Sequence, residues 1–133
     1  MIAHYVRRRV IMIIRDIAGC SHERVIDHSL LCELLHPDTV DGAQDLLCSI
    51  AHAIIPPGES TLPHALKKST ELYYILEGAG EMHIGRESAH VVPGRCILIP
   101  PSARQWIRNT GTGSLVFLCI VLPKWKADDE ILL

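Results

Sequence analysis

The sequence lacks the long apolar run that a secreted or membrane protein carries near its start. Residues 10–14 are apolar and follow Arg7, Arg8 and Arg9, but this run ends after five residues at Arg15. A signal-peptide core or a membrane span needs a longer run. We therefore expect neither a secretion signal nor a membrane partner.

The sequence also lacks an excess of basic charge. It has 13 Lys and Arg against 15 Asp and Glu, with a formal net charge of -2. The basic runs, at residues 7–9 and 67–68, contain three and two residues. Runs this short are typical of a solvated surface rather than of a phosphate-binding stripe, so no nucleic-acid partner is expected.

Closely paired cysteines are missing as well. The five cysteines are odd in number and widely spaced: Cys20, Cys32, Cys48, Cys96 and Cys119. Without a C-x-x-C pair, the pattern indicates neither a disulfide framework nor a zinc knuckle. Each cysteine is interpreted as a small buried apolar residue, and we expect a reducing, cytoplasmic location.

Length and composition predict a single domain. The chain has 133 residues, of which 48% are hydrophobic and 21% charged, an ordinary composition for a globular protein. We expect an N-terminal extension at residues 1–28 and the folded domain at residues 29–133. Translation is expected to begin at Met1 or at Met12, and residues 1–11 are dispensable in the second case.

Short apolar runs between turn residues predict an all-β fold. Residues 29–35 suit a helix or a strand, and we favour a strand that ends before Pro37. Further strands are expected at residues 47–55, 71–76, 81–84, 90–92, 95–99, 105–108 and 115–122. Each is closed by Pro, Gly or Asn, which is typical of a barrel or sandwich. The tail at residues 124–130 is expected outside the barrel, anchored by Trp125.

Two spaced motifs lie between residues 58 and 109. Gly58, His64, Glu71 and Gly78 follow the pattern G-x5-H-x6-E-x6-G. Gly94, Pro100 and Asn109 follow the pattern G-x5-P-x8-N. Together they resemble the two motifs of the cupin superfamily. That resemblance implies a double-stranded β-helix, a jelly-roll barrel of two antiparallel sheets with a site at its mouth, and commonly a homodimer.

The resemblance also implies a metal site, but with fewer ligands than usual. A typical metal-binding cupin holds its ion with three histidines and one glutamate. In this chain Leu66 replaces the second histidine and Gln105 replaces the third. The implied ligands are therefore His64, Glu71 and Gln105, with a weakly bound divalent ion such as Zn, Mn, Ni or Fe.

Strand alternation gives an independent argument about which side chains face the interior. Residues two apart on a strand share a face, so His64 lies with Leu66 and Glu71 lies with Tyr73. If the glutamate faces the interior, the Tyr73 hydroxyl can reach a ligand there. A core role for Tyr73 is the alternative.

Three functions remain open for a small-molecule-binding cupin of this kind. The first is a metal-dependent enzyme in which Glu71 doubles as the catalytic base. The second is a metal-free ligand-binding or sensor module, in which Tyr73 and Gln105 orient the ligand by hydrogen bonds. The third is a metal-free isomerase or epimerase with His64 or Glu71 as base and Tyr73 as acid. Without any function, the polar residues would form a buried cluster bonded to one another.

Overall fold

Alternating apolar side chains produce eleven strands within residues 11–133, the part of the chain that the computed structural model describes. The strands are β1 (Glu23–Arg24), β2 (Leu30–Leu35), β3 (Ser49–Ile55), β4 (His64–Leu66), β5 (Thr70–Glu77), β6 (Gly80–Ile84), β7 (Glu87–Val91), β8 (Cys96–Ile99), β9 (Gln105–Asn109), β10 (Leu115–Leu122) and β11 (Glu130–Leu132). Two short 3-10 helices, η1 (Ile17–Gly19) and η2 (Ala127–Asp129), lie near the two ends of this region. None of the helices described is long and apolar enough to cross a membrane.

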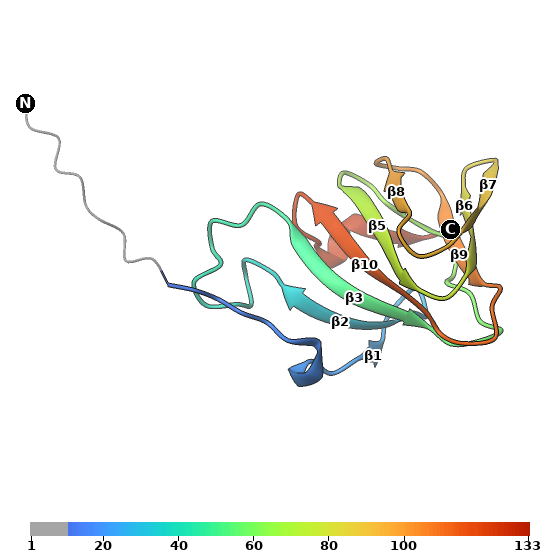
Figure 1. Ribbon diagram of the computed structural model, residues 1–133. Coiled ribbons are helices and arrows are strands. Elements are labelled where there is room, and N and C mark those ends of the chain that lie inside the picture. Colours follow the sequence, from blue (N-terminus) through green and yellow to red (C-terminus); the bar gives the residue numbers. More distant parts are fainter. Residues whose placement is uncertain (1–10) are drawn as a thin grey trace, which may run out of the picture.

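The strands form two antiparallel sheets. One has the order β1-β2-β3-β10-β5-β8 and the other the order β11-β4-β9-β6-β7. Figure 1 shows β2, β3, β10 and β5 side by side in one curved layer. Because β10 pairs with both β3 and β5, strands far apart in the sequence are neighbours in the first sheet. The predicted double-stranded β-helix is confirmed.

The barrel is filled with large apolar side chains at one end only. On β3 the inward positions run from Ile55 through Ala53 to Ser49, and on β5 they run from Ile75 through Tyr73 to Glu71. The buried apolar cluster occupies the end with the large residues. The change to small and polar residues leaves space at the other end, because interiors are otherwise closely packed.

Residues of the two motifs shape the turns at the filled end. Asn109 donates hydrogen bonds from Nδ2 to the carbonyls of Ile55 and Gly113, at 2.9 and 2.8 Å. Gly78 has a φ of 85°, and a Cβ atom there would lie 2.4 Å from the carbonyl oxygen of Ser114. These two residues therefore serve the fold and not the site.

The N-terminal segment lies against the outer face of the first sheet. A disulfide joins Cys20 to Cys32 on β2. Nε2 of His22 and Nδ1 of His52 share a hydrogen bond of 2.8 Å. The expectation of unpaired cysteines is therefore wrong for this pair, because Cys32 faces outward from β2 and meets a segment whose position no sequence pattern indicated. Cys119 is buried as expected, but Cys96 is exposed.

The expected N-terminal extension is described from residue 11 onward; Arg7, Arg8, Arg9 and a start at Met1 fall outside the described residues. Its later part joins the first sheet, since β1 pairs with β2. The boundary at residue 29 itself stays a prediction.

The C-terminal tail is part of the barrel, so the expectation that it lies outside is wrong. Strand β11 pairs with β4 and adds an edge to the second sheet. The carboxylate of Asp129 accepts hydrogen bonds from the backbone nitrogens of Lys68 and Ser69, at 2.8 and 3.2 Å. A polar tail can therefore be fixed by carboxylate contacts that its composition does not reveal.

The disulfide generates a direct test of the N-terminal arrangement. Replacing Cys20 and Cys32 by serine is expected to lower the free energy of unfolding by about 3 kcal/mol, because the closed loop no longer restricts the unfolded chain. Chemical denaturation measures this difference, with Cys48→Ser as the control. Alkylation of all five cysteines in the unreduced, denatured protein would contradict the pairing.

Candidate functional site

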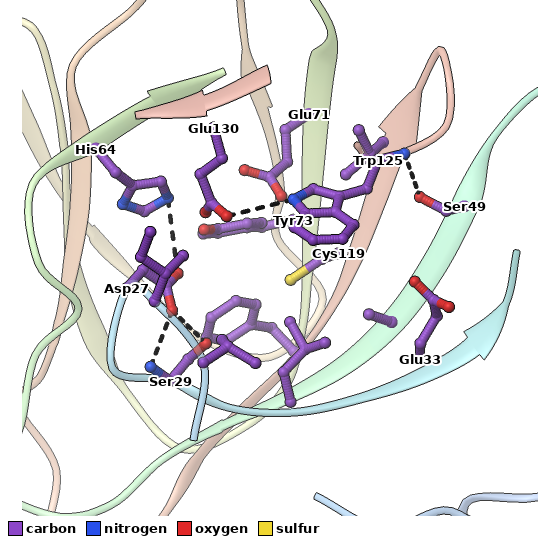
Figure 2. Close-up of a pocket in the computed structure, with 16 residues that line it drawn as sticks. Asp27, Ser29, Glu33, Ser49, His64, Glu71, Tyr73, Cys119, Trp125 and Glu130 are labelled. Atoms are coloured by element: carbon purple, nitrogen blue, oxygen red, sulfur yellow. Dashed lines mark hydrogen bonds and ion pairs between the residues drawn. The ribbon is translucent and has the colours of Figure 1, made fainter. Parts of the chain in front are cut away.

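A cavity of about 330 Å³ occupies the open end of the barrel. Figure 2 shows that its wall combines apolar side chains with carboxyl groups and one imidazole. The acidic residues that line it are Asp27, Glu33, Glu71 and Glu130. Within the described part of the chain, no lysine or arginine lines it. The described wall is therefore rich in acidic groups and contains one basic group, the His64 imidazole.

His64 enters the cavity from β4. It is only 2% exposed, and its Nδ1 atom lies 2.7 Å from the carbonyl oxygen of Leu62. Nδ1 therefore donates a hydrogen bond to that carbonyl, so that in the neutral imidazole the lone pair lies on Nε2. Nε2 lies 3.6 Å from Oδ2 of Asp27, a distance longer than a hydrogen bond.

Asp27 is held in the loop between β1 and β2. Its Oδ1 atom accepts hydrogen bonds from the backbone nitrogen and the hydroxyl of Ser29, at 2.9 and 2.7 Å. Its backbone carbonyl accepts a further hydrogen bond from Leu62, at 2.8 Å. These contacts fix the loop beside His64 and leave Oδ2 directed into the cavity.

Glu130 enters from the start of β11. The indole nitrogen of Trp125 donates a hydrogen bond to its Oε2 atom, at 3.3 Å. Burial raises the pKa of Glu130, and the nearby charge of Asp27 raises it further. One ligand atom from each of Asp27, His64 and Glu130 lies within 4.8 Å of the other two.

Glu71 lies deeper in the cavity and is bonded to Gln105. The amide nitrogen of Gln105 donates a hydrogen bond to Oε1 of Glu71, at 2.9 Å. Burial raises the pKa of Glu71 to about 8; the Gln105 hydrogen bond opposes this shift, and the charges of Asp27 and Glu130 add to it. The carboxyl group is therefore mostly protonated at neutral pH.

Gln105 is completely buried and does not belong to the cavity wall. Its Oε1 atom has no hydrogen-bond partner among the described residues. An amide and a protonated carboxyl group can exchange two hydrogen bonds, so a proton on Glu71 offers the donor that this atom lacks. The pair is consistent with a neutral Glu71.

Tyr73 faces the cavity, as strand alternation predicts. It is 2% exposed, and its ring packs against Phe117 with the centroids 4.4 Å apart. Burial raises the pKa of Tyr73 well above its usual value. Among residues 11–133 no hydrogen bond involves its hydroxyl, so a neutral O–H can donate to a ligand.

The predicted site residues divide into two groups. His64, Glu71 and Tyr73 line the cavity, whereas Gln105 lies behind Glu71. The set of His64, Glu71 and Gln105 as metal ligands stays a prediction. Sequence reasoning missed Asp27 and Glu130, which lie outside both motifs.

Comparisons with known proteins agree with the fold. A family model described as Cupin domain matches residues 51–121. An uncharacterized protein of Methanocaldococcus jannaschii is 40% identical over 107 residues, which cover 80% of this chain and 83% of that protein. The oxalate-binding protein of Thermotoga maritima is 27% identical over 90 residues, which cover 68% of this chain and 74% of that protein.

Solved structures share the same architecture. The crystal structure of a predicted oxalate decarboxylase from Thermotoga maritima has a TM-score of 0.74 at 23% identity and covers 84% of this chain and 99% of that one. A Klebsiella pneumoniae protein with a double-stranded β-helix domain has a TM-score of 0.70 at 15% identity and covers 90% and 95% of the two chains. At these identities the likeness concerns the fold alone.

The raised pKa of Glu71 predicts how stability depends on pH. The folded state keeps this proton up to about pH 8, whereas the unfolded chain releases it near its ordinary pKa of 4.5. The resulting stabilisation is complete below pH 4.5 and is lost as the pH rises towards 8, by about 1.4 kcal/mol for each pH unit. Glu71→Gln stays neutral and should not show this loss.

Thermal unfolding of both proteins between about pH 5 and pH 8 measures the difference. The exposed Glu77→Gln on the same strand is the control and should follow the wild type. Parallel profiles for the wild type and Glu71→Gln would show that Glu71 is ionised in the folded state.

Proposed function

Because the chain belongs to the cupin family, we propose that it binds a small organic acid in the barrel cavity through a divalent metal ion. The observation that carries this proposal is the cavity, in which polar groups converge within an apolar wall. Its volume of about 330 Å³ lies within the range of small-molecule sites, about 300–1,000 Å³.

The charge of the cavity explains why an ion is part of the proposal. A relative is named for oxalate binding, and oxalate is an anion. With carboxyl groups and no lysine or arginine among the described residues of the wall, an organic anion would be repelled unless a cation lies between them. Oxygen and imidazole ligands suit the divalent ions of metal-dependent cupins.

The donors present fit such an ion. His64 offers the lone pair of Nε2, since Nδ1 already donates to Leu62. Glu71 is mostly protonated at neutral pH, and a neutral carboxyl group is a weak ligand. A bound divalent ion would neutralise the acid and polarise its carboxyl group.

Glu71 and Tyr73 provide the chemistry beside the ligand. With a pKa raised to about 8 by burial, Glu71 can give or take a proton near neutral pH and is the candidate catalytic acid or base. The Tyr73 hydroxyl is free to donate a hydrogen bond to a ligand oxygen. Together they favour proton transfer to or from the bound molecule.

Binding of oxalate with and without metal tests this function. Oxalate with Mn²⁺ is expected to raise the melting temperature above the effect of Mn²⁺ alone, whereas oxalate with EDTA should leave it unchanged. Tyr73→Phe should weaken oxalate binding roughly three- to tenfold, as expected for the loss of one hydrogen bond. Equal oxalate binding in EDTA, or none in Mn²⁺, would contradict the proposal.

We also propose that two copies of the chain pair through the outer face of the first sheet. On this face Leu72 lies opposite Leu98, and Tyr74 lies opposite Leu118. Leu98 is 63% exposed, and none of these four residues is charged. The same patch on a second copy would bury this apolar surface around a two-fold axis.

Light scattering coupled to size exclusion measures the pairing. The wild type is expected to elute as a dimer and Leu98→Lys as a monomer, because a lysine within an apolar interface would be buried without a partner. Leu47→Lys is the control, since Leu47 is 77% exposed but lies outside this patch. A monomeric wild type would refute the pairing.

A further inference from the structure

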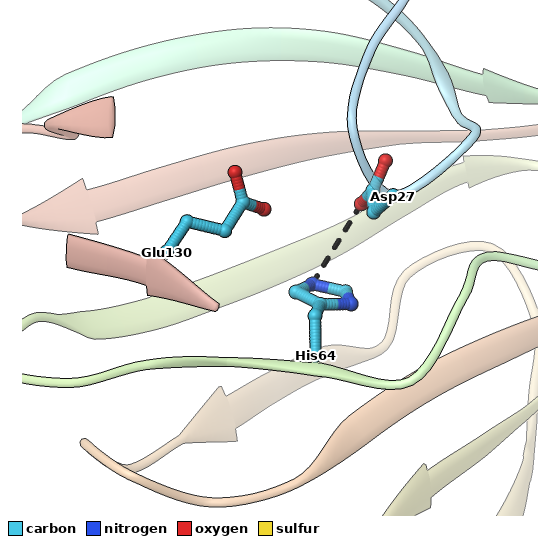
Figure 3. A group of neighbouring side chains, drawn as sticks. All are labelled: Asp27, His64 and Glu130. Carbon is cyan, nitrogen blue, oxygen red and sulfur yellow. Dashed lines mark ion pairs between the residues drawn. The ribbon is translucent and has the colours of Figure 1, made fainter. Parts of the chain in front are cut away.

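We propose that Asp27, His64 and Glu130 form a divalent-metal site. Its ligands come from three segments that lie far apart in the sequence. Figure 3 shows the three side chains pointing toward one another from the loop after β1, from β4 and from β11. The inference rests on the proposed function in one respect: this ion would be the one that binds the organic acid. Binding of the ion itself is measured without any acid.

The distances suit ligands that share one ion. The three ligand atoms lie within 4.8 Å of one another, and Nε2 of His64 lies 3.6 Å from Oδ2 of Asp27. Two ligands of a tetrahedral ion with bonds of about 2.1 Å are about 3.4 Å apart. The observed separation is therefore too long for a hydrogen bond and close to that of two ligands.

Each of the three side chains is oriented by a bond at its other polar atom. His64 donates from Nδ1 to a carbonyl, Asp27 accepts the Ser29 donors at Oδ1, and Glu130 accepts the Trp125 indole at Oε2. Metal ligands are held in this way by groups around the site, which fix the orientation and the histidine tautomer. One electron-pair donor of each residue is left for the centre.

The environment of His64 suits a cation at the centre of the three side chains. The His64 side chain is only 2% exposed, and its Nε2 atom lies 3.6 Å from Oδ2 of Asp27, within ion-pair distance but too far for a hydrogen bond. Its lone pair faces two carboxyl groups, which are also electron-pair donors when ionised. A divalent cation would satisfy all three, and its charge would balance the two carboxylates.

Strand pairing places Glu130 beside Leu66, the position at which a typical metal-binding cupin has its second histidine. Glu130 on β11 lies directly opposite Leu66 on β4, and opposite residues of paired strands share a face. The carboxyl group therefore enters beside the position where Leu66 offers no ligand. Asp27 completes the set from the loop that Leu62 and Ser29 hold in place.

Cobalt(II) titration of the full-length, metal-free protein tests the site, because cobalt–ligand absorption reports coordination directly. The wild type is expected to bind one ion per chain, as checked by elemental analysis. Asp27→Asn and Glu130→Gln should each weaken binding about tenfold or more, by analogy with changes around metal sites. Glu33→Gln makes the same chemical change elsewhere in the cavity wall and should bind as the wild type does.

Two outcomes would overturn the site. One is the absence of cobalt binding by the wild type. The other is loss of binding in Glu71→Gln with retention in Asp27→Asn and Glu130→Gln. The ion would then be bound by Glu71 and not by Asp27 and Glu130. Circular dichroism checks that each variant is folded. If either Asp27→Asn or Glu130→Gln is unfolded, cobalt binding by the folded one of the two tests the site. Cobalt binding as expected, without any response to oxalate, would refute the proposed function and leave this site standing.

Discussion

Acidic groups gathered in a cavity without lysine or arginine are the constraint on which this protein depends. The cavity contains four acidic side chains and, among the described residues, no lysine or arginine. Burying several carboxylates without compensation is costly. Two features lower this cost. Glu71 keeps its proton, since burial raises its pKa to about 8. Asp27 and Glu130 each accept hydrogen bonds at one carboxylate oxygen. A bound cation would compensate the remaining charge and link the electrostatics of the cavity to its proposed function.

The two ends of the described chain position this charge. The Cys20–Cys32 disulfide and the His22–His52 contact hold the N-terminal segment against the first sheet, just ahead of the loop that carries Asp27. Asp129 fixes the C-terminal tail to the backbone that precedes β5, so that the next residue enters the cavity. Contacts on the outside of the barrel therefore determine the geometry inside it.

The fold could be predicted from the sequence because its signals are local. Turn residues and motif spacing predicted most of the strands, and period-two alternation correctly placed Tyr73 toward the interior. The short strand β11 and the disulfide were missed, because each depends on contacts between segments that are separated in the sequence. For the same reason Asp27 and Glu130 could not be found, since only the closed barrel brings them to His64. The sequence did identify Leu66 as a lost ligand position, which is where β11 supplies a carboxyl group.

The location of a bound ion tests the account most directly. Crystals grown with cobalt(II) and no organic acid, measured at the cobalt absorption edge, give the position of the metal through its anomalous signal. The account predicts one peak in the cavity, bonded to Asp27, His64 and Glu130. A peak bonded to Glu71 and Gln105 instead, or no cavity peak at saturating cobalt, would contradict it.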